Sequence, residues 1–212
     1  MAELKDLSIE EFAALTASDA PAPGGGSVSA VAGSLAAALA EMVANLTVGK
    51  AKYAAAEEEM KEIAAKGEKI RKTLVGDIER DSASFNLYME ALGMPKDTEE
   101  QKAARREAMQ NGLKEAARVP LSVAGTAAGI FPLAEAVIAR GNANAVTDGL
   151  VAAMLARTAV IGALFNVKIN LGSIKDEAFR AEMEEEVRRL EAEAVEAEKR
   201  ILKSSELSDS LF

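Results

Sequence analysis

The sequence contains no cysteine and no histidine among its 212 residues. Without cysteine, the chain forms no disulfide and offers no thiolate as a nucleophile or metal ligand. Without histidine, it also lacks the most common general base and the most common metal ligand at neutral pH. If the chain is an enzyme without a cofactor, its proton transfers rely on aspartate, glutamate, lysine or tyrosine, and we expect no metal site.

Aromatic residues are also scarce, at 4% of the chain, and no run of useful length alternates apolar and polar residues as strands do. Hydrophobic residues nevertheless make up 49% and charged residues 28%. A chain of this length can bury one core, built here from small and aliphatic side chains in helices. The sequence therefore predicts a single all-α domain over residues 1–212.

The charge and the apolar runs limit the possible partners and compartments. A formal net charge of −9 argues against non-specific nucleic-acid binding. The first six residues lack the basic and apolar regions of a signal peptide, which favours a cytoplasmic location. The apolar run Val28–Ala40 ends at Glu41, short of the roughly 20 residues that a membrane helix needs. We therefore expect neither a nucleic acid nor a membrane as a partner.

A loop rich in proline and glycine precedes that apolar run. Two prolines extend the chain, three glycines remove every Cβ where the backbone turns, and a serine is placed to cap the helix that follows. Such a loop leaves backbone N–H groups open to a polar or anionic ligand, although a plain structural turn is the alternative. The candidate binding residues here are Pro23, Gly24, Gly25, Gly26 and Ser27.

The most suggestive carboxylates lie in a long helix predicted over residues 54–92. Asp77, Asp81 and Ser84 share one helical face, whereas Ile78 and Phe85 face the core. This geometry places Asp81 at the margin between core and surface. The pattern alone favours a solvated face that carries both aspartates.

Two further stretches bring polar groups to the ends of apolar helices. Lys50, Lys52 and Tyr53 follow the first apolar helix, where they either cap its C-terminus or form an anion site. A second polar loop, which runs from Asn142 to Asp148, leads into an apolar helix predicted from residue 149 to about residue 165. This loop resembles the glycine loop in design.

Three further features of the sequence bear on the helices: a pair of amides, two capping boxes and a proline inside a predicted helix. Asn166 and Asn170 are four residues apart and either close a helix through backbone hydrogen bonds or contact a ligand. Capping boxes at residues 8–11 and 98–101 predict helix starts, and residues 176–203 predict an outer amphipathic helix or dimer arm. Pro120 should kink its helix unless a neighbouring helix satisfies the freed carbonyl.

Taken in order, these motifs resemble the cyclodeaminase half of formiminotransferase-cyclodeaminase, a family that includes stand-alone bacterial cyclodeaminases and methenyltetrahydrofolate cyclohydrolases. The resemblance spans roughly residues 5 to 200. The motifs that carry it are Pro21 to Val28, Asn45 to Thr47 with Gly49-Lys50, Asp81 with Phe85, Met94 to Lys96, Val119 to Leu121, Gly141-Asn142 with Asp148, and Phe165 to Leu171.

The resemblance implies an up-and-down helical bundle around a buried central helix, which works as a homodimer and binds folate in a cleft. The family's catalytic aspartate falls on Asp81, and Glu79 stands where the family often has another aspartate. A carboxylate could move the proton that cyclodeamination requires. We therefore expect Asp81 to be the acid/base and no cofactor to be needed beyond the tetrahydrofolate substrate.

The other candidates divide between the two ends of a folate. The residues expected to orient the pterin are Gly24 to Ser27, Asn142, Asp148 and Asn166, with Pro23 and Asn170 beside them. Those expected to bind the glutamate tail, whether the substrate carries one glutamate or several, are Lys50, Lys52 and Tyr53.

Two other functions fit the same residues. A methenyltetrahydrofolate cyclohydrolase would exchange water instead of ammonia at the same carbon. A non-catalytic helical dimer that binds folate or a protein partner would be favoured if Asp81 were exposed and remote from the glycine loop.

Overall fold

The computed structural model describes residues 3–211, and these residues form helices and turns without a strand. The all-α prediction is confirmed. The α-helices are α1 (Ile9–Thr16), α2 (Gly25–Asn45), α3 (Glu57–Leu92), α4 (Glu99–Ala128), α5 (Phe131–Arg140), α6 (Val146–Leu171) and α7 (Glu177–Lys203), and short 3₁₀ segments lie at Leu4–Asp6, Ala51–Ala56, Ala143–Ala145 and Glu206–Leu211.

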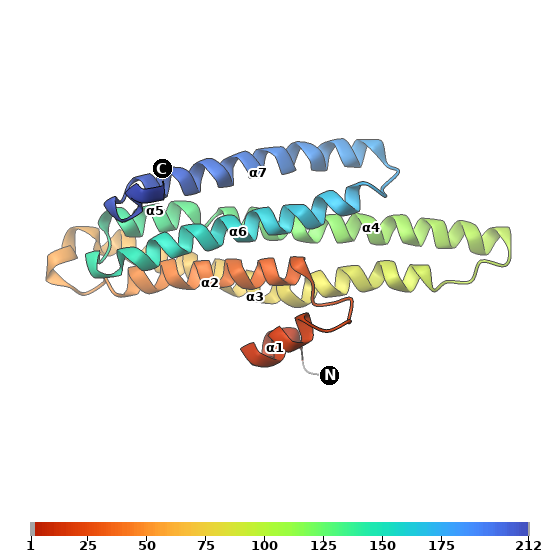
Figure 1. Cartoon of the computed structure of the whole chain (residues 1–212), viewed down its shortest axis with the longest axis horizontal. Helices are drawn as coiled ribbons and strands as arrows, with labels where there is room; N and C mark the ends of the chain where they lie inside the picture. The colour runs from red at the N-terminus through yellow and green to blue at the C-terminus, as the bar shows by residue number, and fades with distance from the viewer. Residues whose placement is uncertain (1–2, 212) are drawn as a thin grey trace.

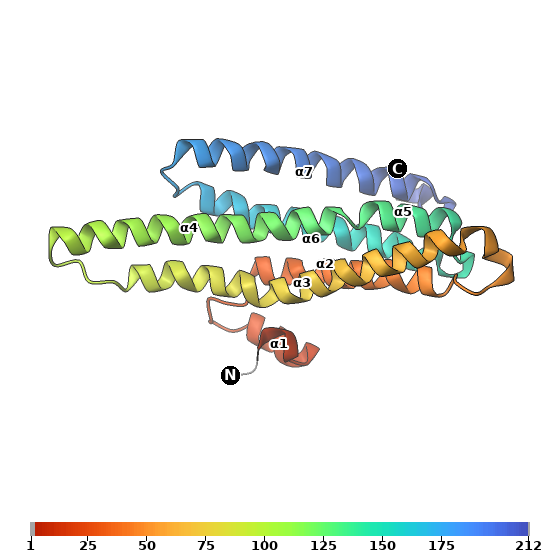
Figure 2. The ribbon, with the colours of Figure 1, turned by 180° about the vertical axis from the view of Figure 1, so that it is seen from behind.

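Four long helices form the body of an up-and-down bundle (Figure 1). α2 packs against α3 and α6, and α4 packs against the same two helices from the other side. The short α5 follows α4 before the chain reverses into α6, and α7 lies outside, against α6, α4 and α5. Seen from behind, α3 and α4 form the layer in front of α2 and α6 (Figure 2).

Small side chains let α2 lie close to its neighbours. A Cβ added at Gly33 would stand only 2.9 Å from Leu74 Cδ1 on α3 and 3.2 Å from Ala159 Cβ on α6. Contacts this tight leave no room for a larger residue. The α2 alanines that are completely shielded from solvent are Ala30, Ala36, Ala37, Ala40 and Ala44.

The predicted helix starts are confirmed where side-chain caps mark them. Ser8 and Thr98 each begin a helix with a complete capping box, and Asp176 Oδ1 accepts the N–H of Phe179 at 3.0 Å. Two other boundaries differ from the prediction. α3 begins at Glu57 because residues 51–56 wind as a 3₁₀ segment, and α6 extends in both directions beyond the predicted 149–165.

One face of the bundle, formed by α2 and α6, carries large apolar side chains that no other part of residues 3–211 covers. We call it the α2–α6 face. Three stretches are long and apolar enough to cross a membrane by length and composition alone. They are Gly25–Asn45, Glu99–Arg140 and Ala143–Leu171, and about half of the most apolar part of each stretch is buried in the bundle. The exposed apolar residues of the face are Val28, Leu35 and Met42 on α2 and Val151, Met154, Phe165 and Ile169 on α6.

The N-terminal segment stands apart from the bundle (Figure 1). α1 has no buried residue, and Ile9 at its start is 91% exposed. The segment is tied to α3 where the N–H of Leu4 donates to Glu79 Oε2 at 2.8 Å. It leads directly into the glycine loop, so it adjoins the end of the bundle where α2 begins.

Candidate functional site

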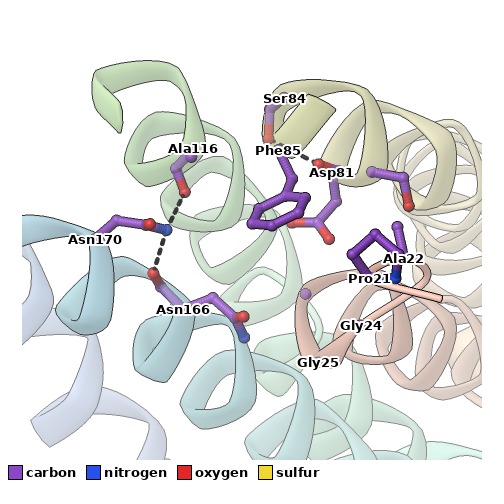
Figure 3. A pocket seen from close by; sticks show the side chains of 12 residues that line it. Pro21, Ala22, Gly24, Gly25, Asp81, Ser84, Phe85, Ala116, Asn166 and Asn170 are labelled. Atoms are coloured by element: carbon purple, nitrogen blue, oxygen red, sulfur yellow. Dashed lines mark hydrogen bonds between the residues drawn. The ribbon is translucent and has the colours of Figure 1, made fainter. Parts of the chain in front are cut away.

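A cavity of about 140 Å³ opens where α2 begins. It lies between the glycine loop, the middle of α3 and the last turns of α6 (Figure 3). The structure thus brings together candidates that are far apart in the sequence: the glycines, Asp81 and the two amides. The lining residues are Pro21, Ala22, Gly24, Gly25, Gly26, Asp81, Ser82, Ser84, Phe85, Ala116, Asn166 and Asn170.

The glycine loop leaves the start of α2 without a side-chain cap. Gly24 is the N-cap residue, and its extended backbone leads into the helix at Gly25. The first N–H groups of a helix have no acceptor within it, and those of Gly25 and Gly26, which line the cavity, have none elsewhere in residues 3–211. The prediction that Ser27 caps α2 is wrong, because the helix begins at Gly25, three residues earlier than a cap at Ser27 would place it. Pro23 is buried behind the loop and does not line the cavity.

Gly26 allows a carboxylate to lie directly against the start of α2. A Cβ at this position would overlap Asp81 Oδ1. Any side chain here would therefore displace the Asp81 carboxylate. With glycine in place, the carboxylate lies at the positive end of the α2 dipole, which favours its charged form.

Asp81 is only partly exposed, as the sequence predicted, and its surroundings act on its pKa in two directions. Burial raises the pKa of its carboxyl, the neighbouring Asp77 raises it further, and hydrogen bonds from Ser27 lower it, with a net increase. A carboxyl with a raised pKa takes up a proton more readily than a free aspartate and can return it afterwards. This is the property that a catalytic acid/base requires.

Asp77 departs from its prediction, because it is buried rather than solvated. It is 3% exposed; Oδ1 accepts from Arg80 Nη1 at 2.9 Å, while Oδ2 is buried without a partner. Burial raises its pKa despite Arg80. The pattern of charged neighbours on α3 did not reveal that packing buries this position.

The hydroxyl of Ser27 faces three oxygen atoms but has only one hydrogen. Its Oγ lies 3.0 Å from the carbonyl oxygen of Ile78, 3.1 Å from Asp81 Oδ2 and 3.1 Å from Ser82 Oγ. When Asp81 is ionised, Ser27 can donate to the carboxylate. When Asp81 is protonated, the acid can donate to Ser27, whose hydrogen then turns to the Ile78 carbonyl. Both protonation states of Asp81 are thus hydrogen-bonded, although Ser27 is fully buried.

The opposite wall of the cavity is formed by two amides of α6 (Figure 3). Asn166 Nδ2 donates to the carbonyl of Gly162 at 2.9 Å, and Asn170 Nδ2 donates to the carbonyls of Asn166 at 2.8 Å and Ala116 at 2.9 Å. The local amide-to-backbone bonds that the spacing allowed are therefore present. They use amide hydrogens only, so the two side-chain oxygens remain available as acceptors.

Comparison with known proteins identifies the family. The sequence profile described as formiminotransferase-cyclodeaminase matches residues 8–189, which is most of the chain. The chain belongs to the formiminotransferase-cyclodeaminase family. The resemblance inferred from the motifs is thereby confirmed.

Relatives that carry two different enzyme names match most of this chain. It is 41% identical to the methenyltetrahydrofolate cyclohydrolase of Methylorubrum extorquens over 92% of this chain and 93% of that protein. It is 35% identical to the formimidoyltransferase-cyclodeaminase of Sus scrofa over 88% of this chain, but spans only 34% of that protein. The crystal structure of formiminotetrahydrofolate cyclodeaminase from Thermotoga maritima is 37% identical, covers 95% of this chain and 96% of that one, and superposes with a TM-score of 0.85.

The remaining candidates do not line the cavity. α2 has 21 residues, and at a rise of about 1.5 Å per residue it separates its two ends by roughly 30 Å. The residues after its C-terminus and those of the second polar loop lie at the far end. Within one chain, the structure therefore does not bring the following candidates to Asp81: Lys50, Lys52, Tyr53, Asn142 and Asp148.

At that far end, polar side chains bind the protein's own backbone. The N–H of Asn142 donates to Thr47 Oγ1 at 2.8 Å, its Nδ2 donates to the carbonyl of Leu46 at 3.3 Å, and its Oδ1 accepts the N–H of Asn144 at 3.2 Å. The hydroxyl of Tyr53 accepts the N–H of the residue after Asn142 at 3.1 Å. We call this arrangement the Thr47–Asn142 clasp. It joins the end of α2 to the loop before α6.

Some lining residues had no assigned role in the sequence-based prediction. Ser82 takes part in the Ser27 network, and Ser84 donates to the carbonyl of Asp81 at 2.7 Å. Ala116 contributes its backbone carbonyl, and the proline four residues later is the signal that could have revealed it. Glu79 binds the N-terminal segment and does not line the cavity. No cluster of three or more potential metal-binding side chains occurs in residues 3–211.

Proposed function

We propose that the chain is a folate one-carbon enzyme, a formiminotetrahydrofolate cyclodeaminase that converts 5-formimino-tetrahydrofolate to 5,10-methenyl-tetrahydrofolate and ammonia. The observation that carries this proposal is Asp81, a carboxyl with a raised pKa at the edge of a polar cavity. The names of the relatives support a tetrahydrofolate derivative as the substrate.

The reaction starts from the protonated formimino group and requires the transfer of one further proton, from N10 to the leaving nitrogen. N10 of the substrate attacks the formimino carbon, the bond from that carbon to the imino nitrogen breaks, and ammonia leaves. Asp81 takes the proton that N10 loses and gives it to the departing nitrogen, while the Ser27 hydroxyl turns with each change. No electrons are exchanged with another group. Atoms and charge balance when the formimino nitrogen is protonated at the start, because the amidinium cation then becomes the methenyl cation and neutral ammonia. We therefore propose that no cofactor takes part.

The size of the cavity suggests which part of the folate it holds. A volume of about 140 Å³ is below the roughly 300–1,000 Å³ of most ligand pockets. We propose that the bicyclic pterin enters, between the N–H groups of Gly25 and Gly26 and the amides of Asn166 and Asn170. The aminobenzoyl and glutamate parts would then extend along the outside of the bundle.

We propose that the protein is a homodimer, joined through the α2–α6 face. A continuous exposed apolar surface marks an interaction site, and a symmetric dimer buries the same patch on both copies. If the two α2 helices cross antiparallel, the Lys50 end of one copy lies near the cavity of the other. This arrangement would reunite the two groups of candidate residues and complete each site.

The dimer can be tested by light scattering of the purified protein. The expected mass is near twice the 22.2 kDa of one chain. Leu35→Asp, in the middle of the face and 53% exposed, should give monomers. Val195→Asp is the matched control, because Val195 is 38% exposed on α7, away from the face, and should stay dimeric. A wild-type monomer would contradict the proposal.

Lys50, Lys52 and Tyr53 are proposed to hold the glutamate tail. The Lys52 ammonium lies 5.2 Å from the centre of the Tyr53 ring, so cations and a phenol are grouped there. A variant with Lys50→Ala and Lys52→Ala should lose its preference for polyglutamylated over monoglutamylated substrate. An unchanged preference would remove these residues from the tail site.

A methenyltetrahydrofolate cyclohydrolase is the second candidate, favoured by the Methylorubrum extorquens relative that matches along almost its whole length. The absorbance of the methenyl group separates the two. Its growth from 5-formimino-tetrahydrofolate, with release of ammonia, supports the cyclodeaminase. Accelerated loss of the methenyl band without activity on the formimino compound supports the cyclohydrolase. No change with either compound would favour a non-catalytic dimer that binds folate or a protein partner.

A further inference from the structure

Helix α4 continues through a proline. Pro120 lies inside Glu99–Ala128, with eight helical residues after it. Proline has no backbone N–H, so the carbonyl four residues earlier, that of Ala116, loses its helical donor. Both Pro120 and Ala116 are buried, and a buried carbonyl without a partner is unfavourable. The chain therefore needs a donor from another element.

The missing donor comes from α6. Asn170 Nδ2 lies 2.9 Å from the Ala116 carbonyl and 2.8 Å from the carbonyl of Asn166 (Figure 3). An amide has two N–H donors, and these two bonds use both of them. The amide cannot turn over, because its oxygen would then face two carbonyl oxygens. The gap left by Pro120 thus fixes the orientation of the Asn170 side chain.

This orientation leaves one polar atom available. Asn170 lines the cavity, and its Oδ1 takes part in no hydrogen bond within residues 3–211. Nor does it belong to the buried side-chain atoms that lack a partner, which in the same residues are Asp77 Oδ2 and Arg180 Nε. The oxygen is therefore accessible. Next to it, Asn166 also uses Nδ2 as its donor, at 2.9 Å from the Gly162 carbonyl. The α6 wall consequently presents acceptors.

We propose that Pro120 is a positioning residue for substrate binding: by leaving the Ala116 carbonyl unpaired, it holds the Asn170 amide so that Oδ1 accepts a hydrogen bond from the N–H groups on the aminopyrimidinone edge of a pterin. The inference rests on the proposed folate substrate. That edge carries an amino group and a ring N–H side by side, and an amide oxygen can accept a hydrogen bond from either of them. A substrate with acceptors along this edge would be rejected, because its oxygens would face those of Asn166 and Asn170.

Pro120→Ala tests this role directly. Alanine restores the N–H, so the Ala116 carbonyl regains its helical bond and the Asn170 amide is free to turn. We expect KM to rise about tenfold, the effect of one hydrogen bond, while kcat stays close to wild type. The midpoint of thermal unfolding should be kept or raised, because alanine is the better helix residue. Pro132→Ala is the matched control: Pro132 is exposed at the start of α5, and its loss should change neither constant.

Asn170→Ala tests the same contact from the side of α6. It keeps the test usable if Pro120→Ala lowers the stability of the protein. If Pro120 acts through Asn170, adding Pro120→Ala to Asn170→Ala should raise KM no further. Independent, multiplicative effects would overturn the proposal, and so would a wild-type KM in Pro120→Ala.

A binding measurement separates this inference from the proposed activity. 5-Formyl-tetrahydrofolate carries the same pterin edge but is not deaminated, and calorimetry gives its Kd without turnover. A tenfold weaker Kd for Pro120→Ala supports the inference even if the wild type proves inactive as a cyclodeaminase. An unchanged Kd, or a wild type that does not bind the compound, would overturn it.

Discussion

The two ends of the bundle look alike in the sequence but differ in what their polar groups bind. At each end a polar loop precedes an apolar helix. At the start of α2, free N–H groups, the Asp81 carboxyl and two amide oxygens surround a cavity. At the start of α6, the Thr47–Asn142 clasp uses its side chains on nearby backbone groups.

The difference arises from the residues beside each helix start. Gly24 has no side chain with which to satisfy the N–H groups that follow it, so they remain open to a ligand. Asn142, by contrast, accepts the N–H of Asn144 with its own side chain. A polar loop before a buried helix therefore indicates a binding site only where the loop lacks side chains that could cap the helix itself.

The largest effect should come from removing the carboxyl at the cavity end. Asp81→Asn keeps the size of the side chain but cannot carry a proton between N10 and the leaving nitrogen. We expect turnover to decrease roughly 10²- to 10⁴-fold, with unchanged circular dichroism. Rates of methenyl formation by both proteins provide the measurement. Near-normal turnover would remove Asp81 from the mechanism.

Displacing the same carboxyl should have the next largest effect. Gly26→Ala places a methyl group against Asp81 Oδ1, whereas a Cβ at Gly76, which is exposed on α3, would meet no atom within 4 Å. We expect Gly26→Ala to reduce kcat on the order of tenfold or more and the free energy of unfolding by about 1–3 kcal/mol. Gly76→Ala serves as the control and should keep or raise the wild-type stability, because alanine is the better residue inside a helix. Equal effects of the two changes would contradict the close approach.

The far end should respond in stability rather than in turnover. Thr47 is 1% exposed, and its Oγ1 accepts the N–H of Asn142 and donates to the carbonyl of Val43. Thr47→Val removes both bonds and should lower the free energy of unfolding by about 1–2 kcal/mol. Urea unfolding measures that loss, and kcat with a monoglutamate substrate should not change. A loss of kcat at full stability would mean that the clasp takes part in catalysis.

The smallest effect should be a pH dependence of stability that originates at the cavity end. The pKa of Asp81 is raised in the folded chain, relative to about 3.9 for a free aspartate. Between these two values the folded state binds more protons, so the free energy of unfolding decreases as the pH rises and stays lower above this window. Asp77 contributes in the same direction.

This dependence is measured by urea unfolding of the wild type and Asp81→Asn at a series of pH values. Because the variant lacks the titrating group, its stability should increase relative to that of the wild type as the pH rises from about 4. A difference that does not change with pH would show that Asp81 titrates alike in the folded and unfolded chain.

The sequence predicted the helices and their caps because these depend on residues close together in the chain. The capping boxes at Ser8 and Thr98 and the buried stripe of α7 are such local features. Asp81 and the glycine loop could also be predicted, from the order of the family's motifs. Their contact across α2 and α3 could not be derived from spacing.

What the sequence did not reveal depends on the packing of distant elements. Asp77 is buried by the packing of α3 in the bundle, although its neighbours along the chain are charged. Nothing in the spacing of Asn142 or Lys50 indicates which end of the bundle they reach, because the length of α2 decides that. Likewise, Pro120 predicts a carbonyl without its helical donor, but only the fold shows that the Asn170 amide supplies the missing donor.

The alanine-rich interior of α2 also limits how members of this family can diverge. Where Gly33 fits between Leu74 and Ala159, an enlarged side chain would push helices apart. The interior is thus closed to gradual change in size, whereas the rim of the cavity, at Ala22 and Phe85, adjoins open space. Evolution toward a different one-carbon substrate should therefore accumulate its substitutions around the rim and leave the centre of the bundle almost invariant.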